Sequence, residues 1–438
     1  MFSFMNDKNK RILAVFFFLF LSYSGYTQRY LSDLDSSLFI RDTLRPLLQR
    51  FENLRFTGYI QPQYQVAQSN GAKSYNGGDF SEFSKSRFML RRARLKVDYF
   101  LLTNDGYAKA LFTFQIDATE RGVGLRDMFV KLYEPKKHNF SITMGMFARP
   151  FGFEVNLSSA FRETPERGRM SQILMPSERD LGAMVSYEPL RKGAKNKFVK
   201  VDIGFFNGQG LSGTADFDSY KDLNGRLTIK PIHWHKFEFS GGLSLFRGGW
   251  KQATKYIYRA GENVAGDKIF KVDSTVTNIG EIAPRHYRGA DTQVKLKHGW
   301  GETEWRAEYW SGQQPGTIVT TANPGMLPTL PTYIRHFDGL FLLFLQHIIN
   351  KKNQLLLKYD WYDSNTHVKG NDIGKPGTNL TVPDIKYSTL GLGFVRQIST
   401  NLKIILYYDV VKNEKTLLSG YVSDLKDNIF TCRMQFRF

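Results

Sequence analysis

Polar and apolar residues alternate one by one along much of this chain. The alternation is clearest over residues 106–118, where Phe112 and Phe114 share one face while Thr113 and Gln115 share the other. A period of two residues is typical of a β-strand, because successive side chains of a strand point to opposite faces of the sheet. One face suits lipid and the other suits water, so the pattern predicts strands that separate the two.

The same alternation recurs in sixteen segments of the chain. We predict strands over residues 54–66, 87–99, 106–118, 124–134, 138–147, 180–188, 198–207, 220–231, 235–246, 286–299, 301–312, 335–348, 353–364, 385–396, 400–413 and 427–438. An even number of strands, and a last strand that ends on an aromatic residue such as Phe438, are typical of bacterial outer-membrane barrels. The predicted fold class is therefore all-β: a transmembrane antiparallel β-barrel.

The connections between these segments alternate in length. Those after the second, fourth, tenth, twelfth and fourteenth segments are brief, as at Pro135–Lys137, whereas those after the fifth, ninth, eleventh and thirteenth are long. Outer-membrane barrels have short periplasmic turns and longer external loops. The alternation therefore places 191–197 and 351–352 in the periplasm, 250–283 and 365–384 outside, and makes 148–179 the third external loop.

The first residues have the pattern of a secretory leader. Basic residues within 8–11 precede an apolar run at 12–21, and small and polar residues follow. A run of about ten apolar residues is too short for a membrane-spanning helix, which needs about twenty. We expect a signal peptide over residues 1–28, cleaved somewhere within 24–28.

A short segment separates this leader from the first strand. Leu44, Leu47 and Phe51 lie at helical spacing, which predicts a short periplasmic helix within residues 29–53. No linker rich in Pro, Ser or Gly divides the remainder, so we expect one barrel domain over residues 54–438.

The composition agrees with an exported barrel. Aromatic residues make up 15% of the chain, as aromatic girdles at two membrane interfaces require. A net charge of +19 favours anionic solutes or an acidic membrane surface, since export argues against nucleic acid. The single cysteine, Cys432, excludes an internal disulfide, and its place in the alternation puts it on the lipid face.

Three stretches resemble the phosphate-selective porin O and P family as it occurs in Bacteroidetes: RFMLRRARLKVDY at 87–99, GMFARPFGFE at 145–154 and SERDLGAMVSYEP at 177–189. The resemblance implies a sixteen-stranded barrel, often a homotrimer, whose third external loop folds inward to narrow a pore for anions such as phosphate. The length of 148–179 agrees with an inward fold, because it exceeds what an exposed turn needs.

Basic residues on the inferred inward faces and in the third loop are the candidate pore lining. Arg92, Arg94 and Lys96 fall on the face opposite Ala93 and Leu95, and a lysine or arginine facing lipid at the membrane midplane costs about 2–4 kcal/mol. The full set of candidates is Arg92, Arg94, Lys96, Lys109, Lys131, Arg149, Arg162, Arg167, Arg169 and Arg433. Glutamates accompany the loop arginines, so the alternative role of those arginines is to pair with glutamates and hold the loop to the wall.

These observations predict a porin in the outer membrane of a Gram-negative cell, embedded among lipid and lipopolysaccharide, that lets small polar solutes diffuse with a modest preference for anions. We predict no enzymatic activity, no cofactor, no metal site and no nucleic-acid partner. Two alternatives stay open. One is an outer-membrane enzyme barrel, a phospholipase or protease, which would hold a nucleophile and a base within hydrogen-bond reach at the rim. The other is a secretion or adhesion barrel with a plugged lumen.

Overall fold

The computed structural model describes residues 53–438 except 192, 195, 214 and 215. The expected signal peptide over 1–28 and the expected helix within 29–53 concern residues outside this described part. Among the described residues, no helix is long and apolar enough to cross a membrane.

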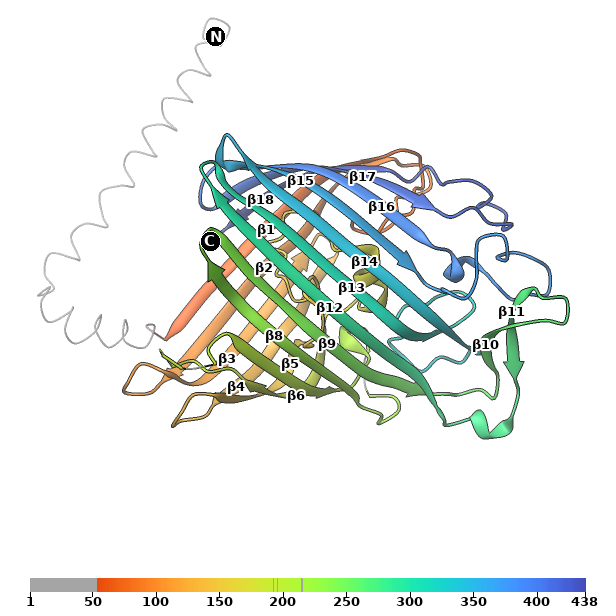
Figure 1. Cartoon of the computed structure of the whole chain (residues 1–438), viewed down its shortest axis with the longest axis horizontal. Coiled ribbons are helices and arrows are strands. Elements are labelled where there is room, and N and C mark those ends of the chain that lie inside the picture. The colour runs from red at the N-terminus through yellow and green to blue at the C-terminus, as the bar shows by residue number, and fades with distance from the viewer. Residues whose placement is uncertain (1–52, 192, 195, 214–215) are drawn as a thin grey trace, which may run out of the picture. The chain divides into compact units, whose positions relative to one another are not determined.

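One sheet of 18 strands makes up most of the described chain (Figure 1). The strands of its wall are β1 (Leu54–Ala67), β2 (Ser86–Leu102), β3 (Ala108–Thr119), β4 (Gly122–Tyr133), β5 (Phe140–Ala148), β6 (Arg179–Tyr187), β7 (Val199–Phe206), β8 (Asp222–Trp234), β9 (Phe237–Lys251), β12 (Ile282–His298), β13 (Gly301–Gly316), β14 (Thr332–Ile348), β15 (Asn350–Asp363), β16 (Tyr387–Gln397), β17 (Leu402–Asn413) and β18 (Ile429–Arg437). All sixteen predicted segments are strands of this wall.

The wall closes on itself because β1 pairs with β18. Tyr59 lies opposite Arg437 and Ala67 lies opposite Ile429 in an antiparallel register. The backbones of Gly58 and Phe438 exchange two hydrogen bonds, of 3.1 and 3.0 Å. Closure leaves no free strand edge in the wall, and the predicted antiparallel barrel of sixteen strands is confirmed.

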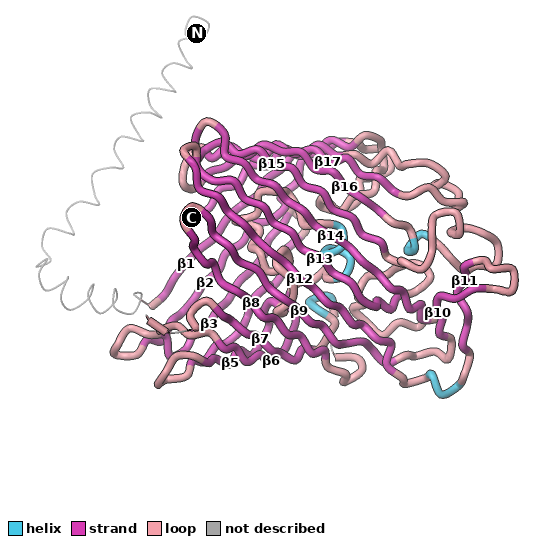
Figure 2. The backbone as a smooth tube through the Cα atoms, in the orientation of Figure 1, coloured by secondary structure: helices cyan, strands magenta, loops and turns pink. Residues whose placement is uncertain are grey.

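Two further strands form a hairpin that the alternation did not predict. β10 (Ile257–Glu262) and β11 (Lys268–Asp273) lie within 250–283, which we expected to be a plain external loop. β10 pairs in parallel with the first residues of β14, where Ile257 lies opposite Thr332. The hairpin lies beyond the wall, at the end of the barrel that carries the long loops (Figure 2).

The two faces of the wall differ in polarity as the alternation predicted. In β18 the buried Thr431, Arg433 and Gln435 point inward, whereas the exposed Phe430 and Met434 point outward. Cys432 shares the outward face, as its place in the alternation predicts. The apolar outer face fits a barrel that is surrounded by lipid and that keeps its polar groups inside.

Candidate functional site

Residues 149–178, which connect β5 to β6, fold into the lumen, and we call this segment loop 3 (Figure 1). It contains the short helix α4 (Arg169–Leu174). Wall residues far around the barrel hold its backbone: Gln61 of β1 donates to the carbonyl oxygen of Ser159 at 3.0 Å, and Lys403 of β17 donates to that of Arg162 at 2.9 Å. The predicted inward fold of the third external loop is confirmed.

An apolar cluster fixes one side of loop 3 against the wall. Its fully or nearly buried members from loop 3 and from β9, β12, β13, β14 and β15 are Phe151, Val155, Met170, Leu174, Met175, Phe246, Tyr287, Trp310, Phe337 and Tyr362. The Phe151 ring meets the Trp310 ring edge-on, with 4.8 Å between the centroids. Burying such a set removes several large apolar side chains from water, and each of them contributes about 1.5–3 kcal/mol to the free energy of unfolding.

A carboxylate of the wall holds the start of loop 3 beside this cluster. Glu308 of β13 accepts hydrogen bonds from the backbone N–H groups of Phe153 at 2.7 Å and Glu154 at 2.8 Å. Gly152 makes this approach possible, because its φ of 70° is left-handed and a Cβ there would lie 2.5 Å from Glu308 Oε1 and 2.6 Å from the ring of Trp310.

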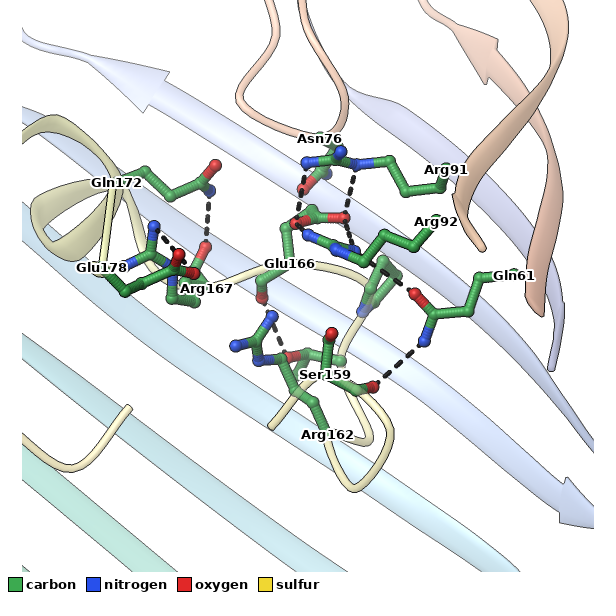
Figure 3. Close-up of polar contacts among 12 residues, drawn as sticks. Gln61, Asn76, Arg91, Arg92, Ser159, Arg162, Glu166, Arg167, Gln172 and Glu178 are labelled. Atoms are coloured by element: carbon green, nitrogen blue, oxygen red, sulfur yellow. Dashed lines mark hydrogen bonds and ion pairs between the residues drawn. The ribbon is translucent and has the colours of Figure 1, made fainter. Parts of the chain in front are cut away.

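Glu166 anchors the side of loop 3 that lies away from the apolar cluster (Figure 3). Its carboxylate lies 2.6 Å from Arg92 Nη2, 2.9 Å from Arg91 Nε and 2.9 Å from Arg433 Nη2. The first two arginines belong to β2 and the third belongs to β18, so one loop side chain joins two strands that flank β1. Charge-assisted hydrogen bonds of this kind are about twice as strong as neutral ones.

Burial and charge act in opposite directions on Glu166. Removal from water disfavours the carboxylate, but the charges of Arg91, Arg92 and Arg433 outweigh that effect and hold the pKa of Glu166 well below its usual range. The anchor is therefore ionised at neutral pH.

Most of the predicted loop arginines are engaged within loop 3 or with its neighbours. Arg167 donates to the carbonyl oxygen of Met175 at 3.0 Å and lies 3.6 Å from Glu178. Arg162 donates to the carbonyl oxygen of Leu157 at 3.1 Å. Arg149 donates to the carbonyl oxygen of Ser177. Arg167 thus has the glutamate partner that the alternative role requires, whereas Arg162 and Arg149 donate to backbone carbonyls of loop 3 itself. The pore-lining role of these arginines stays a prediction.

The remaining predicted residues of β2 and β3 have different surroundings. Arg94 pairs with Asp117 at 2.8 Å and donates to Ser159 Oγ at 3.0 Å, which ties β2 to loop 3. Lys96 pairs with Asp98 at 2.8 Å. Lys109 is exposed near the start of β3.

Arg169 lies on the external side of loop 3, between two aromatic rings. Its guanidinium carbon is 3.8 Å from the ring centroid of Tyr387 and 4.6 Å from that of Tyr75, a residue of the connection between β1 and β2. These three side chains line an external hollow of about 640 Å³. Stacking of this kind holds a planar cation in place while leaving its edge free to donate.

A second space, of about 370 Å³, remains between loop 3 and the opposite wall. Pro150 and Asn156 of loop 3 face it on one side, and residues of β2, β4, β5, β6, β7 and β8 face it on the other. Loop 3 packs through its apolar cluster against β9 and β12–β15, so this space lies on the side of the lumen away from that cluster.

Four cations and two carboxylates line this space. The cations are Lys96, Lys131, Lys200 and Arg226, and the carboxylates are Asp127 and Asp202. Lys200 pairs with Asp202 at 2.8 Å and Arg226 pairs with Asp291 at 2.7 Å. Within the described part of the chain, Lys131 alone of these four cations has no ion pair; its ammonium lies 5.1 Å from the ring centroid of Tyr133.

Our sequence-based selection missed three residues of the site. Lys200 and Arg226 lie on inward faces of predicted strands, so the alternation could have identified them. Glu308 also lies on an inward face, but its role depends on the path of loop 3, which no local pattern encodes. No group of three or more His, Cys, Asp or Glu residues in the described ranges is placed to hold a metal ion.

Comparison with solved structures shows the same fold in outer-membrane porins. Pseudomonas putida OprB has a TM-score of 0.57 and 12% sequence identity, with 91% of this chain and 97% of that chain covered. The anion-selective porin from Comamonas acidovorans has a TM-score of 0.51 and 12% identity, covering 88% of this chain and 99% of that chain. The outer-membrane channel DcaP of Acinetobacter baumannii has a TM-score of 0.50 and 12% identity, covering 88% of this chain and 97% of that chain. No protein-family model and no curated protein sequence matches the chain.

Proposed function

We propose that this chain is an outer-membrane porin through which small polar solutes diffuse passively. The observation that carries the proposal is the space of about 370 Å³ between loop 3 and the wall of β2 and β4–β8. A closed strand wall, an apolar outer face and an inward loop with a space beside it are the parts that a diffusion channel needs. Its fold neighbours include an anion-selective porin and an outer-membrane channel.

The same space supports a modest preference for anions. Its cations outnumber its carboxylates, and most of these cations are neutralised by a neighbouring aspartate. Lys131 then contributes most of the uncompensated positive charge, which raises the local concentration of anions without excluding cations. We also propose membership of the phosphate-selective porin O and P family, with phosphate among the solutes and a homotrimer as the assembly, on the resemblance of 87–99, 145–154 and 177–189.

Single-channel recording in planar bilayers tests the proposal. The purified protein should give stable open conductance, and deletion of residues 155–172 should raise it because loop 3 then fills less of the lumen. Shortening the external turn at 263–267, which lies in the β10–β11 hairpin, is the matched control and should leave conductance unchanged. A bilayer that stays closed with the folded protein would favour a plugged secretion or adhesion barrel. Lipid or peptide hydrolysis by the same preparation would favour the enzyme barrel.

A further inference from the structure

A row of polar side chains crosses four neighbouring strands on the outer surface of the barrel. The register places Arg247 of β9 opposite His286 of β12, His286 opposite Gln313 of β13, and Gln313 opposite His336 of β14. These four strands lie side by side in the front wall of Figure 1. Side chains that are directly opposite in such a ladder lie about 4.5–5.5 Å apart, so the row is continuous.

This row faces away from the lumen. The residues that precede or follow its members in sequence, Phe246, Tyr287 and Phe337, belong to the buried apolar cluster that includes Phe151 of loop 3. Because side chains alternate along a strand, Arg247, His286 and His336 must point outward. The next residue along the outward face of β12, Arg288, is also exposed.

The outward surface around this row is basic. In the described part of the chain, neither Arg247 nor Arg288 makes an ion pair. His367 adds a third imidazole, with its ring 4.6 Å from that of His336. Among the described residues that line the hollow beside this surface, Asp338 alone is acidic, and it already accepts a hydrogen bond from Trp361 Nε1 at 3.3 Å.

The aromatic neighbours of the row indicate its position along the barrel axis. Tyr309 of β13 and Trp361 of β15 lie opposite Leu340, two residues beyond Asp338 on the outward face of β14, and Leu342 continues that face toward the periplasm. Aromatic residues mark the interface between the hydrocarbon and the headgroups. The basic row lies immediately external to them, where lipid headgroups lie and where an arginine costs only about 0–1 kcal/mol.

A hollow of about 760 Å³ accompanies the row, with Arg247, His286, Arg288, Tyr309, His336 and His367 among its lining. We propose that this hollow binds a phosphate group on the headgroup of an anionic lipid of the outer leaflet. Two exposed guanidinium groups offer planar pairs of donors that match phosphate oxygens, and the imidazoles can donate further hydrogen bonds. The volume falls in the range of small-molecule sites, about 300–1,000 Å³.

Native mass spectrometry of the detergent-solubilised protein tests this site, with diphosphorylated lipid A as the probe. The double variant Arg247→Gln/Arg288→Gln should bind the probe at least about tenfold more weakly, and the same lipid without its phosphates should bind both proteins alike. Lys412→Gln is the matched control, because Lys412 is an exposed outward-facing residue of β17 and should not change binding.

Two results would overturn the proposal. One is equal affinity of the wild type and the double variant for the phosphorylated probe. The other is unchanged lipid binding together with a loss of oligomer in the double variant, which would make this face an interface between copies of the chain. Heat-modifiable gel mobility reports folding, and conductance should stay at the wild-type value. Failure of this site and failure of the proposed channel function are therefore distinguishable.

Discussion

Replacing Glu166 with glutamine should release the far side of loop 3 while leaving its apolar cluster intact. The wild-type side chain is 3% exposed and contacts Arg91, Arg92 and Arg433. Glutamine keeps the shape but removes the charge, which leaves three guanidinium groups without their shared counter-charge. Removing one partner of a buried ion pair costs about 3–5 kcal/mol, and we expect the upper part of that range because three pairs are broken together.

Two measurements check this expectation. The free energy of unfolding, from urea titration followed by heat-modifiable mobility, should fall by about 3–5 kcal/mol. Single-channel recording should show a larger and noisier conductance, because the segment around Glu166 can then leave the wall. Glu163→Gln is the matched control: Glu163 pairs with Arg306, which keeps a second carboxylate partner, Glu304, at 2.7 Å, so the loss should be smaller.

The pH dependence follows from the lowered pKa of Glu166. A carboxylate whose pKa is depressed on folding stabilises the fold fully above its ordinary pKa of 4.5 and loses that contribution only as the pH falls through the lowered value. Wild-type conductance should therefore be the same at neutral and mildly acidic pH. A Glu166→Gln variant with wild-type stability, conductance and noise would refute the anchoring role of this residue.

Three further outcomes are expected. Lys131→Gln should lower the preference for anions, seen as a shift of the zero-current potential under a salt gradient, whereas Lys109→Gln at an exposed position should not; equal shifts would contradict the role of Lys131. Phe151→Ala should lower the free energy of unfolding in urea by about 3–5 kcal/mol, and a loss below about 1 kcal/mol would show that the apolar cluster does not hold loop 3. In a cysteine-free background, Lys369→Cys should react with a membrane-impermeant thiol reagent on intact cells and Lys352→Cys should not; the reverse result would invert the topology.

The wall of the barrel could be predicted from the sequence because each strand carries its own signal. The inward Thr113 and Gln115 alternate with the outward Phe112 and Phe114, and that pattern needs no knowledge of the partner strand. The strand β14 shows the limit of this reasoning. Its inward Leu343 and Leu345 are apolar and buried, and its outward Leu342 is apolar too, so alternation over that run does not distinguish the two faces.

The interactions of loop 3 could not be predicted from local pattern. Glu166 and Arg433 are 267 positions apart in the chain, and nothing near either residue specifies the other. The hairpin of β10 and β11 was missed for a related reason: each strand has 6 residues, and β10 is aligned by a parallel contact with β14. In both cases the path of the chain in space, and not the period of its side chains, decides which groups meet.

The position of Glu166 also has a consequence for the assembly of the barrel. Its carboxylate contacts β2 and β18, which lie on either side of β1, the strand that closes the wall. Before the last strand arrives, Arg433 is absent from the site, so loop 3 lacks the hydrogen bonds that Arg433 donates to Glu166 and to the carbonyl oxygen of Pro165. Docking of loop 3 and closure of the wall therefore stabilise each other. In a barrel that has not closed, loop 3 lacks its contacts with β18. Loop 3, the segment that we propose narrows the passage, is therefore fully anchored only after the last strand has joined the first.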